Sequence, residues 1–475
     1  MTIIRRTFAG IAGCSAVLAL LCANASCVSS RSLVASPAQG EDAPTTADAT
    51  LAGASAAPPA ANAGEDAQHV WTTADCISYA WSHNRAIARA RWRILGARAK
   101  IDEADADYLP TIRADAAGST RNNDSGINFE GVAFVTGDRS VATGDVLASV
   151  PLFGVPLGRR AGAHHGMSGA RADIEQVRAD VAYDIAQSML DVREARLRVE
   201  LMTASITALA AQASIADDRQ RAGLAFTTDV LADQVRISER EQDRLHAQND
   251  VAIALGRLDR LIGLPLERSL LLADEQEAPP PSTDETALTL QALSHRQDLT
   301  AARERLLQAQ EGIRDAQTQY LPQANLVAGY YVSTDSLVLN RQWFGASLNV
   351  SVPLLDSGVV AAQVDGCRAK VGELSEAVNE LVDQIREEVH DALLDLHEAS
   401  ARIPVVAKSR DLARQRLTQV QDQYRQGLSD MTTVLAAEND AVTAELQELH
   451  ARFDARRSYD QLAHAIHAPA PGTPP

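Results

Sequence analysis

The stretch Tyr108-Leu109-Pro110 recurs as Tyr320-Leu321-Pro322, and these two copies decide how the chain folds. Each copy leads through an alternating, Gly-rich segment to a second shared motif. That motif is Val150-Pro151-Leu152-Phe153-Gly154 in the first half and Val352-Pro353-Leu354-Leu355-Asp356 in the second. Matched motifs in one order indicate an internal duplication, in which each copy buries its apolar face against the other. The repeat therefore sets the architecture.

A third pair of motifs follows at matching distance in each half. Gly223-Leu224 precedes Thr228-Asp229-Val230-Leu231, and Gly427-Leu428 precedes Thr433-Val434-Leu435. The Pro-rich joint at 278–282 falls between the halves. We therefore expect these boundaries: a first repeat over 71–265 with its tip at 223–229, a linker over 266–283, a second repeat over 284–467 with its tip at 427–435, and a disordered tail over 468–475.

Residues 1–27 have the pattern of an export signal peptide, because Arg5 and Arg6 precede an apolar run that is too short to span a membrane. Two processing sites compete at its end. Ordinary signal peptidase would cut after Ala25, whereas a degraded lipobox would make Cys27 an acylated residue carrying palmitate. Residues 28–70 contain almost no large apolar side chains, so we expect a flexible tether there.

Composition excludes several classes of function. The formal net charge of -18 argues against nucleic acid as a partner, because an acidic surface cannot replace the counterions of phosphates. The sequence shows no nucleophile elbow, phosphate loop, paired catalytic acids or metal-ligand spacing. We therefore expect no enzyme activity, no cofactor and no metal. The low aromatic content of 4% is typical of long helices with narrow apolar seams.

Helical periodicity dominates both halves. One helix is expected from Thr73 to about Asp107, and two much longer ones over 158–223 and 358–427. At about 1.5 Å per residue each long helix spans roughly 100 Å. Shorter helices then return to about 263 and 467. Apolar side chains at steps of three and four form a coiled-coil seam: Ile174, Val177, Val181, Ile185, Met189 and Val192 in the first half, and Val371, Leu374, Val378, Leu381, Ile385 and Val389 in the second.

Two β-hairpins are expected, over 111–153 with a polar loop at 121–126, and over 323–355. In the second hairpin Phe344, Ala346, Leu348, Val350 and Val352 alternate with small or polar residues. This is the pattern of an outer-membrane strand that faces lipid on one side and water on the other. A soluble hairpin packed on a core is the alternative. The aromatic residues near the loop end favour the membrane, as a girdle at its outer interface: Tyr330, Tyr331, Trp343 and Phe344.

This arrangement resembles the outer-membrane factor (TolC-like) family, and its lipoprotein drug-efflux branch in particular. The resemblance covers about Thr72 to His467 and includes the opening of the second repeat, Arg296-Gln297-Asp298-Leu299-Thr300-Ala301-Ala302. It implies a mainly α fold with a small β part, a homotrimer with one shared twelve-stranded β-barrel, and a periplasmic α-helical barrel below it. Four strands cannot close a barrel alone, and open edges in lipid leave backbone groups unsatisfied, so the trimer is also expected physically.

The resemblance also implies a gate and a docking surface at the helix tips. By position relative to the tip glycines, Asp229 and Tyr424 match an acid and its tyrosine partner in the gate. A ring of acid could instead come from Asp233 or Asp430, which are otherwise solvated polar residues at helix turns. The family's basic partner is replaced by Ser429, and its other acids by Thr433 and Ala436. The expected adaptor-docking residues are Gly223, Leu224, Gly427 and Leu428.

The function implied is a passive outer-membrane exit duct of a tripartite efflux system. Its partners would be a periplasmic adaptor (membrane fusion protein), an inner-membrane pump and outer-membrane lipid. Two other functions remain open. The outer-membrane component of type I protein secretion would share the fold. A periplasmic adaptor also has a coiled-coil hairpin, but it carries one hairpin between lipoyl-like halves and no membrane strands.

Overall fold

The computed structural model describes residues 70–122, 125–130, 132–223, 226–265, 271–273, 284–336 and 338–468. The expected signal peptide, the tether up to residue 69, most of the linker, residues 469–475 of the tail, Cys27 and Leu224 lie outside these residues. The chain folds into two compact units. Asp102–Arg160 and Ile313–Asp365 carry the main sheet, and Ala161–Gly312 and Gly366–Pro475 carry most of the helical residues.

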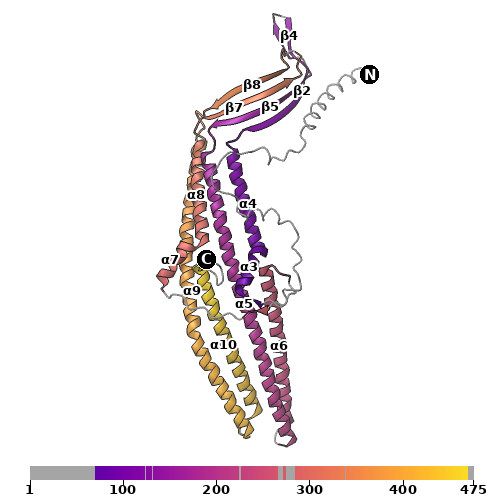
Figure 1. Ribbon diagram of the computed structural model, residues 1–475, viewed down its shortest axis with the longest axis vertical. Helices are drawn as coiled ribbons and strands as arrows, with labels where there is room; N and C mark the ends of the chain where they lie inside the picture. Colours follow the sequence, from indigo (N-terminus) through magenta and orange to yellow (C-terminus); the bar gives the residue numbers. More distant parts are fainter. Residues whose placement is uncertain are drawn as a thin grey trace, which may run out of the picture. The chain divides into compact units, whose positions relative to one another are not determined.

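The main sheet has four antiparallel strands in the order β2-β5-β7-β8 (Figure 1). The strands are β2 (Thr111–Thr120), β5 (Ser140–Phe153), β7 (Gln323–Ser333) and β8 (Gln342–Ser351). Their alternating sequences form strands because each presents one apolar and one polar row. Within the described chain, β2 and β8 each pair on one side only. The sheet therefore has two open edges.

The polar loop expected at 121–126 is only partly a loop. Between β2 and β5 in the sequence, β3 (Ser125–Phe129) and β4 (Val132–Gly137) form a separate hairpin. The prediction was wrong there because β4 carries Val, Phe and Val at strand-favouring positions. A turn at Glu130, whose φ is 50°, joins the two short strands.

The register of the sheet aligns the apolar residues of all four strands on one face. Leu326 lies opposite Leu348, and Tyr330 lies opposite Phe344. On the neighbouring strand Val150 pairs with Leu326. Phe344 (85% accessible), Leu348 (60%) and Leu326 (40%) are exposed in the single chain, and Tyr330 and Val150 are half-buried. The sheet therefore has a continuous apolar face that protein does not cover.

The opposite face is mostly small and polar. It includes the pair Asn325 and Asn349, and an ion pair of 2.7 Å between Arg113 Nε and Asp115 Oδ2. The expected aromatic girdle is divided between the two faces. Tyr331 stacks on Trp343 with ring centroids 5.2 Å apart, but both belong to the polar row. Successive side chains of a strand point to opposite faces. Of the four aromatic residues, only Tyr330 and Phe344 therefore lie on the apolar face, where the girdle was expected.

The long helices form two helical hairpins, seen side by side as pairs in Figure 1. The first helical hairpin consists of α5 (Leu157–Arg221) and α6 (Thr227–Ile262), and the second of α9 (Val359–Arg425) and α10 (Met431–Ala465). Pro404 lies inside α9, which continues through it. Seam residues form the cores, and at most 1% of the surface of each of these is exposed: Ile185, Met189, Val192, Ile385 and Val389.

Two helices replace the single helix expected from Thr73 to Asp107. They are α3 (Thr73–His83) and α4 (Arg85–Ala106), and the break between them lies at Asn84. The Asn84 side chain accepts hydrogen bonds from the backbone N–H groups of Ala86 and Ile87, at 2.7 and 3.3 Å. It thus caps α4 and makes a new helix start more favourable than continuation. The prediction missed this cap because Asn also occurs inside helical patterns.

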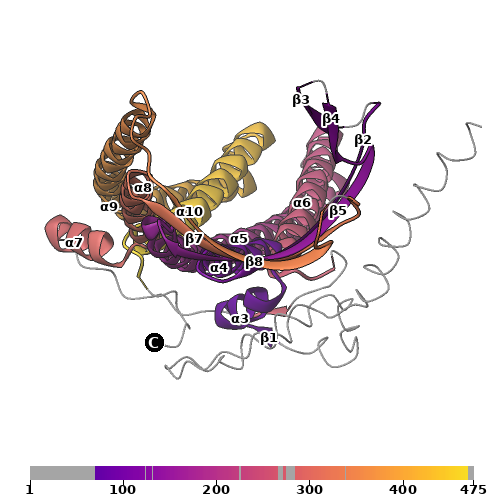
Figure 2. The same cartoon turned by 90° about the horizontal axis from the view of Figure 1, so that it is seen from above.

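The second repeat has the same break, between α7 (Glu285–His295) and α8 (Gln297–Thr318). Arg296 stands at this break, where its guanidinium pairs with Asp298 and Glu388. A short parallel pair of strands, β1 (Val70–Trp71) and β6 (Leu271–Leu272), connects the start of the first repeat to the linker. Figure 2 shows α3 and β1 on the same side of α5.

Candidate gate at the helix tips

Each helical hairpin turns at a glycine with a left-handed backbone. The φ angle is 72° at Gly223 and 76° at Gly427, a conformation that residues with a Cβ rarely adopt. After the second turn, Asp430 is the N-cap of α10 and accepts a hydrogen bond of 2.9 Å from the backbone N–H of Thr433. This contact gives Asp430 a local structural role at the start of the helix.

An apolar cluster joins the two helical hairpins just above their turns. We call it the tip cluster, and it consists of Ala216, Val420, Met431, Val434 and Ala437. Each of these residues is less than one tenth exposed. The tip of the first hairpin therefore packs directly against the tip of the second, with Tyr424 partly buried beside the cluster.

Tyr424 is held from the first hairpin. Arg219 Nη1 donates a hydrogen bond of 2.8 Å to the Tyr424 carbonyl, and its guanidinium lies 5.0 Å from the ring centroid. The phenolic oxygen is buried without a hydrogen bond of ordinary geometry to the described residues. Burial raises the pKa of Tyr424, the carboxylate of Asp229 raises it further, and Arg219 lowers it. The structure thus brings Asp229 and Tyr424 together.

Asp233 lies one turn further along α6 and is completely buried. One of its oxygens accepts a hydrogen bond of 3.0 Å from Gln212 Nε2, and the other has no partner among the described residues. Burial raises the pKa of Asp233 to about 6, with a smaller contribution from Asp229. The side chain lies in the packing between helices, so it is not part of an exposed acidic ring.

The turns present large apolar side chains to solvent. Leu428 is 74% exposed and Phe226 is 79% exposed. The sequence analysis named Leu428 but missed Phe226. The signal was a large aromatic residue three positions after a turn glycine, in a chain with few aromatic residues.

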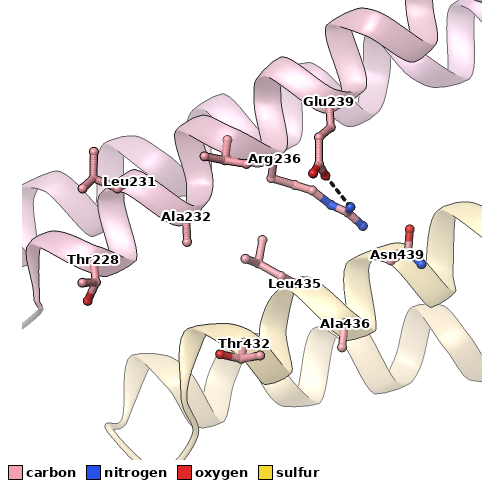
Figure 3. A pocket seen from close by; sticks show the side chains of 10 residues that line it. Thr228, Leu231, Ala232, Arg236, Glu239, Thr432, Leu435, Ala436 and Asn439 are labelled. Atoms are coloured by element: carbon pink, nitrogen blue, oxygen red, sulfur yellow. Dashed lines mark hydrogen bonds and ion pairs between the residues drawn. The ribbon is translucent and has the colours of Figure 1, made fainter.

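A groove of about 570 Å³ separates α6 from α10 beside the tip cluster. Apolar side chains line its walls, among them Leu231, Val235 and Leu435. Figure 3 shows Ala232 and Leu435 pointing into the space between the two helices, with Arg236 at the far end. There Arg236 Nη1 forms an ion pair of 2.8 Å with Glu239.

The described part of the chain contains no group of His, Cys, Asp and Glu side chains arranged to hold a metal ion. Its polar clusters are helix caps, ion pairs and the acid and phenol groups at the tips. These arrangements position helices relative to each other.

Comparison with known proteins decides the family. The profile of a family described as outer membrane efflux protein matches residues 76–264 and 288–466, so it matches both repeats. The chain belongs to the outer membrane efflux protein family. This outer-membrane protein therefore has the location expected from its sheet, and the family resemblance found in the sequence is confirmed.

Solved structures of outer-membrane channels have the same fold. VceC from Vibrio cholerae aligns with a TM-score of 0.69 and 20% identity, over 83% of this chain and 95% of its own. The channel OprN aligns with a TM-score of 0.68 and 19% identity, over 84% of this chain and 90% of its own. The open state of MtrE from Neisseria gonorrhoeae aligns with a TM-score of 0.65 and 20% identity, over 83% of this chain and 88% of its own. No curated protein matches closely enough to count as a relative.

These comparisons confirm the fold class, mainly helical with a small sheet and an internal repeat. The gate and docking residues stay predictions.

Proposed function

We propose that the protein is the exit channel of a tripartite efflux system and passes small molecules, such as drugs or other toxic compounds, across the outer membrane. The observation that carries this proposal is the two-sided sheet. Its apolar face suits lipid and its polar face suits a water-filled lumen. The chain would act as a conduit without catalysis, because the energy for transport would come from a partner pump.

The sheet also supports assembly as a homotrimer. A four-stranded sheet with open edges at β2 and β8 leaves backbone N–H and C=O groups unpaired in lipid. Pairing of β2 in one copy with β8 in the next satisfies these groups and closes a barrel. Three copies give the barrel twelve strands, enough for an open lumen rather than a packed interior.

The helix tips would form the periplasmic entrance. At this level Arg219 of the first helical hairpin holds Tyr424 of the second by a hydrogen bond to its carbonyl, and the Asp229 carboxylate lies near the Tyr424 phenol. We assign the closed state of the entrance to this contact. The exposed tip residues Gly223, Gly427, Leu428 and Phe226 would meet a periplasmic adaptor, which would connect the channel to an inner-membrane pump.

Conductance of the purified protein in a planar lipid bilayer tests the proposal. We expect the wild-type protein to conduct ions weakly, and Asp229→Ala combined with Tyr424→Phe to conduct more because the tips separate. Asp250→Asn is a suitable control, since this exposed residue of α6 pairs only loosely with Arg198 at 3.6 Å. A gate variant that conducts like the control would remove the pair from the gate, and a protein that never conducts would refute the channel.

We also propose that Cys27 carries the lipid anchor of the mature protein. The residues Asn24-Ala25-Ser26-Cys27 support this as a degraded lipobox. Mass spectrometry of the mature N-terminus tests it. An acylated Cys27 at the first position agrees with the proposal, and an unmodified Ser26 there contradicts it.

A further inference from the structure

Glu438 is a buried carboxylate of α10 that lies beside the far end of the groove, next to the lining residue Asn439. Groups from the first helical hairpin hold both of its oxygens. Ser205 Oγ on α5 donates a hydrogen bond of 2.9 Å to Oε1. On α6, Arg236 Nε lies 3.3 Å and Arg240 Nη2 lies 3.4 Å from Oε2. One side chain of the second hairpin is thus surrounded by three from the first.

The arginines of this cluster are themselves fixed. Arg240 is only 7% exposed, and it also donates hydrogen bonds of 3.1 Å to Asn439 and to Asp243. Separation of the hairpins at this level would leave a buried carboxylate and a buried guanidinium without each other. A movement too small to admit water is therefore strongly unfavourable, because each charge loses its partner and stays buried. The cluster therefore holds the two hairpins in one register.

The contacts closer to the turns are of a different kind. Glu438 lies seven residues after Met431, which corresponds to about two helical turns or about 10 Å. Within this distance the hairpins meet mainly through the apolar side chains of the tip cluster, and one hydrogen bond, from Arg219 to the Tyr424 carbonyl, joins them nearer the turns. Apolar contacts are not directional, so they tolerate sliding. Asp233 adds a buried oxygen without a hydrogen-bond partner among the described residues, and the buried Tyr424 phenol lacks a hydrogen bond of ordinary geometry, which makes the closed packing easier to leave.

We infer that the cluster of Glu438, Ser205, Arg236 and Arg240 is the fulcrum about which the tips separate, and that Glu438 is a positioning residue of the gate. The inference rests on the proposed channel function. The cluster keeps the hairpins joined while the contact between Asp229 and Tyr424 opens and closes below it. It also sets how far Tyr424 can move from Asp229.

Glu448 provides a matched control on the same helix. It is 5% exposed, compared with 6% for Glu438, and it is also held by two arginines. These are Arg410 and Arg452, which both belong to the second helical hairpin. Loss of the Glu448 charge therefore removes a comparable buried ion pair but leaves the contact between the hairpins intact.

The experiment compares Glu438→Gln with Glu448→Gln in the full-length purified protein. Thermal unfolding in detergent reports stability, and conductance in planar bilayers reports the open fraction. We expect both variants to lower the unfolding temperature. Only Glu438→Gln should raise the ratio of open to closed channels, by about fivefold or more. A factor of about five is the lower end of the energetic coupling usually found between two sites of a protein. Equal conductance in the two variants would overturn the inference.

Two further variants separate failure of this inference from failure of the channel proposal. If Asp229→Ala with Tyr424→Phe raises conductance but Glu438→Gln does not, the gate stands and the fulcrum is refuted. If neither wild type nor any variant conducts, the channel itself is refuted. Should Glu438→Gln fail to fold, Arg240→Gln tests the same cluster, because Arg236 remains to neutralise Glu438. It should raise the open fraction too, and unchanged conductance would refute the fulcrum.

Discussion

The buried carboxylate of Asp233 should make the stability of the tips depend on pH. Its pKa of about 6 in the folded protein lies above its ordinary value of 3.8. The folded tip therefore favours the protonated acid. The resulting stabilisation is fully present below about pH 3.8 and is lost as the pH rises through about 6.

The size of the effect follows from the shift in pKa. A difference of about two units corresponds to about 3 kcal/mol between the fully protonated and fully ionised states. About 1.4 kcal/mol of this loss falls between about pH 5 and about pH 7.5, which is a factor of about ten in the opening equilibrium. Asp233→Asn resembles the protonated acid, so the variant should keep its tips closed over the whole range.

Hydrogen exchange of peptides from α6 and α10 near the tips measures this local opening. After correction for the intrinsic effect of pH, wild type should open about ten times more readily at about pH 7.5 than at about pH 5. Asp233→Asn should show no such change, and the exposed control Asp250→Asn should behave like wild type. A pH dependence that survives in Asp233→Asn would refute the assignment to this carboxylate.

Three other substitutions, two of them with a control variant, test separate parts of the account. Leu348→Arg, on the apolar face of β8, should destabilise the protein in lipid vesicles by about 2–4 kcal/mol, whereas Ser347→Arg on the polar face should have little effect. Gly427→Ala should lower stability by about 1–2 kcal/mol in thermal unfolding because its φ is 76°, whereas Gly372→Ala in open space on α9 should stabilise by about 1 kcal/mol. Asn84→Ala should increase hydrogen exchange in the first turn of α4 by removing a cap worth about 1 kcal/mol; unchanged exchange would contradict that role.

The long helices and the duplication were predictable because their signals are repeated many times. The seam runs through Ile185 and Met189 in the first half and Ile385 and Val389 in the second, and each is buried in a helical core. A periodic pattern of this length outweighs a single contrary residue such as Pro404, which α9 accommodates.

The division of the aromatic residues between the two faces of the sheet depends on register. The sequence places Tyr330, Tyr331, Trp343 and Phe344 near one loop, but only strand pairing shows which of them share a face. Alternation along each strand was visible in the sequence and already separates Tyr330 from Tyr331. The expectation of one common girdle overlooked this alternation.

The partners of the buried polar groups at the tips could not be predicted. Asp233 and Gln212 are 21 residues apart, and Glu438 meets Arg240 across 198 residues. Both acids follow ordinary helical spacing and resemble solvated surface residues in the sequence. Only the packing of one hairpin on the other shows that they are buried, and the family resemblance pointed first to Asp229 and Tyr424, with Asp233 only as an alternative source of acid.

The central claim is that one chain supplies four strands of a channel that three copies complete. Native mass spectrometry of the detergent-solubilised protein from outer membranes tests it most directly. We predict a complex of three identical chains that persists on dilution, because each open edge of β2 pairs with β8 of a neighbour. A membrane-embedded protein that is released as a single chain would contradict the account.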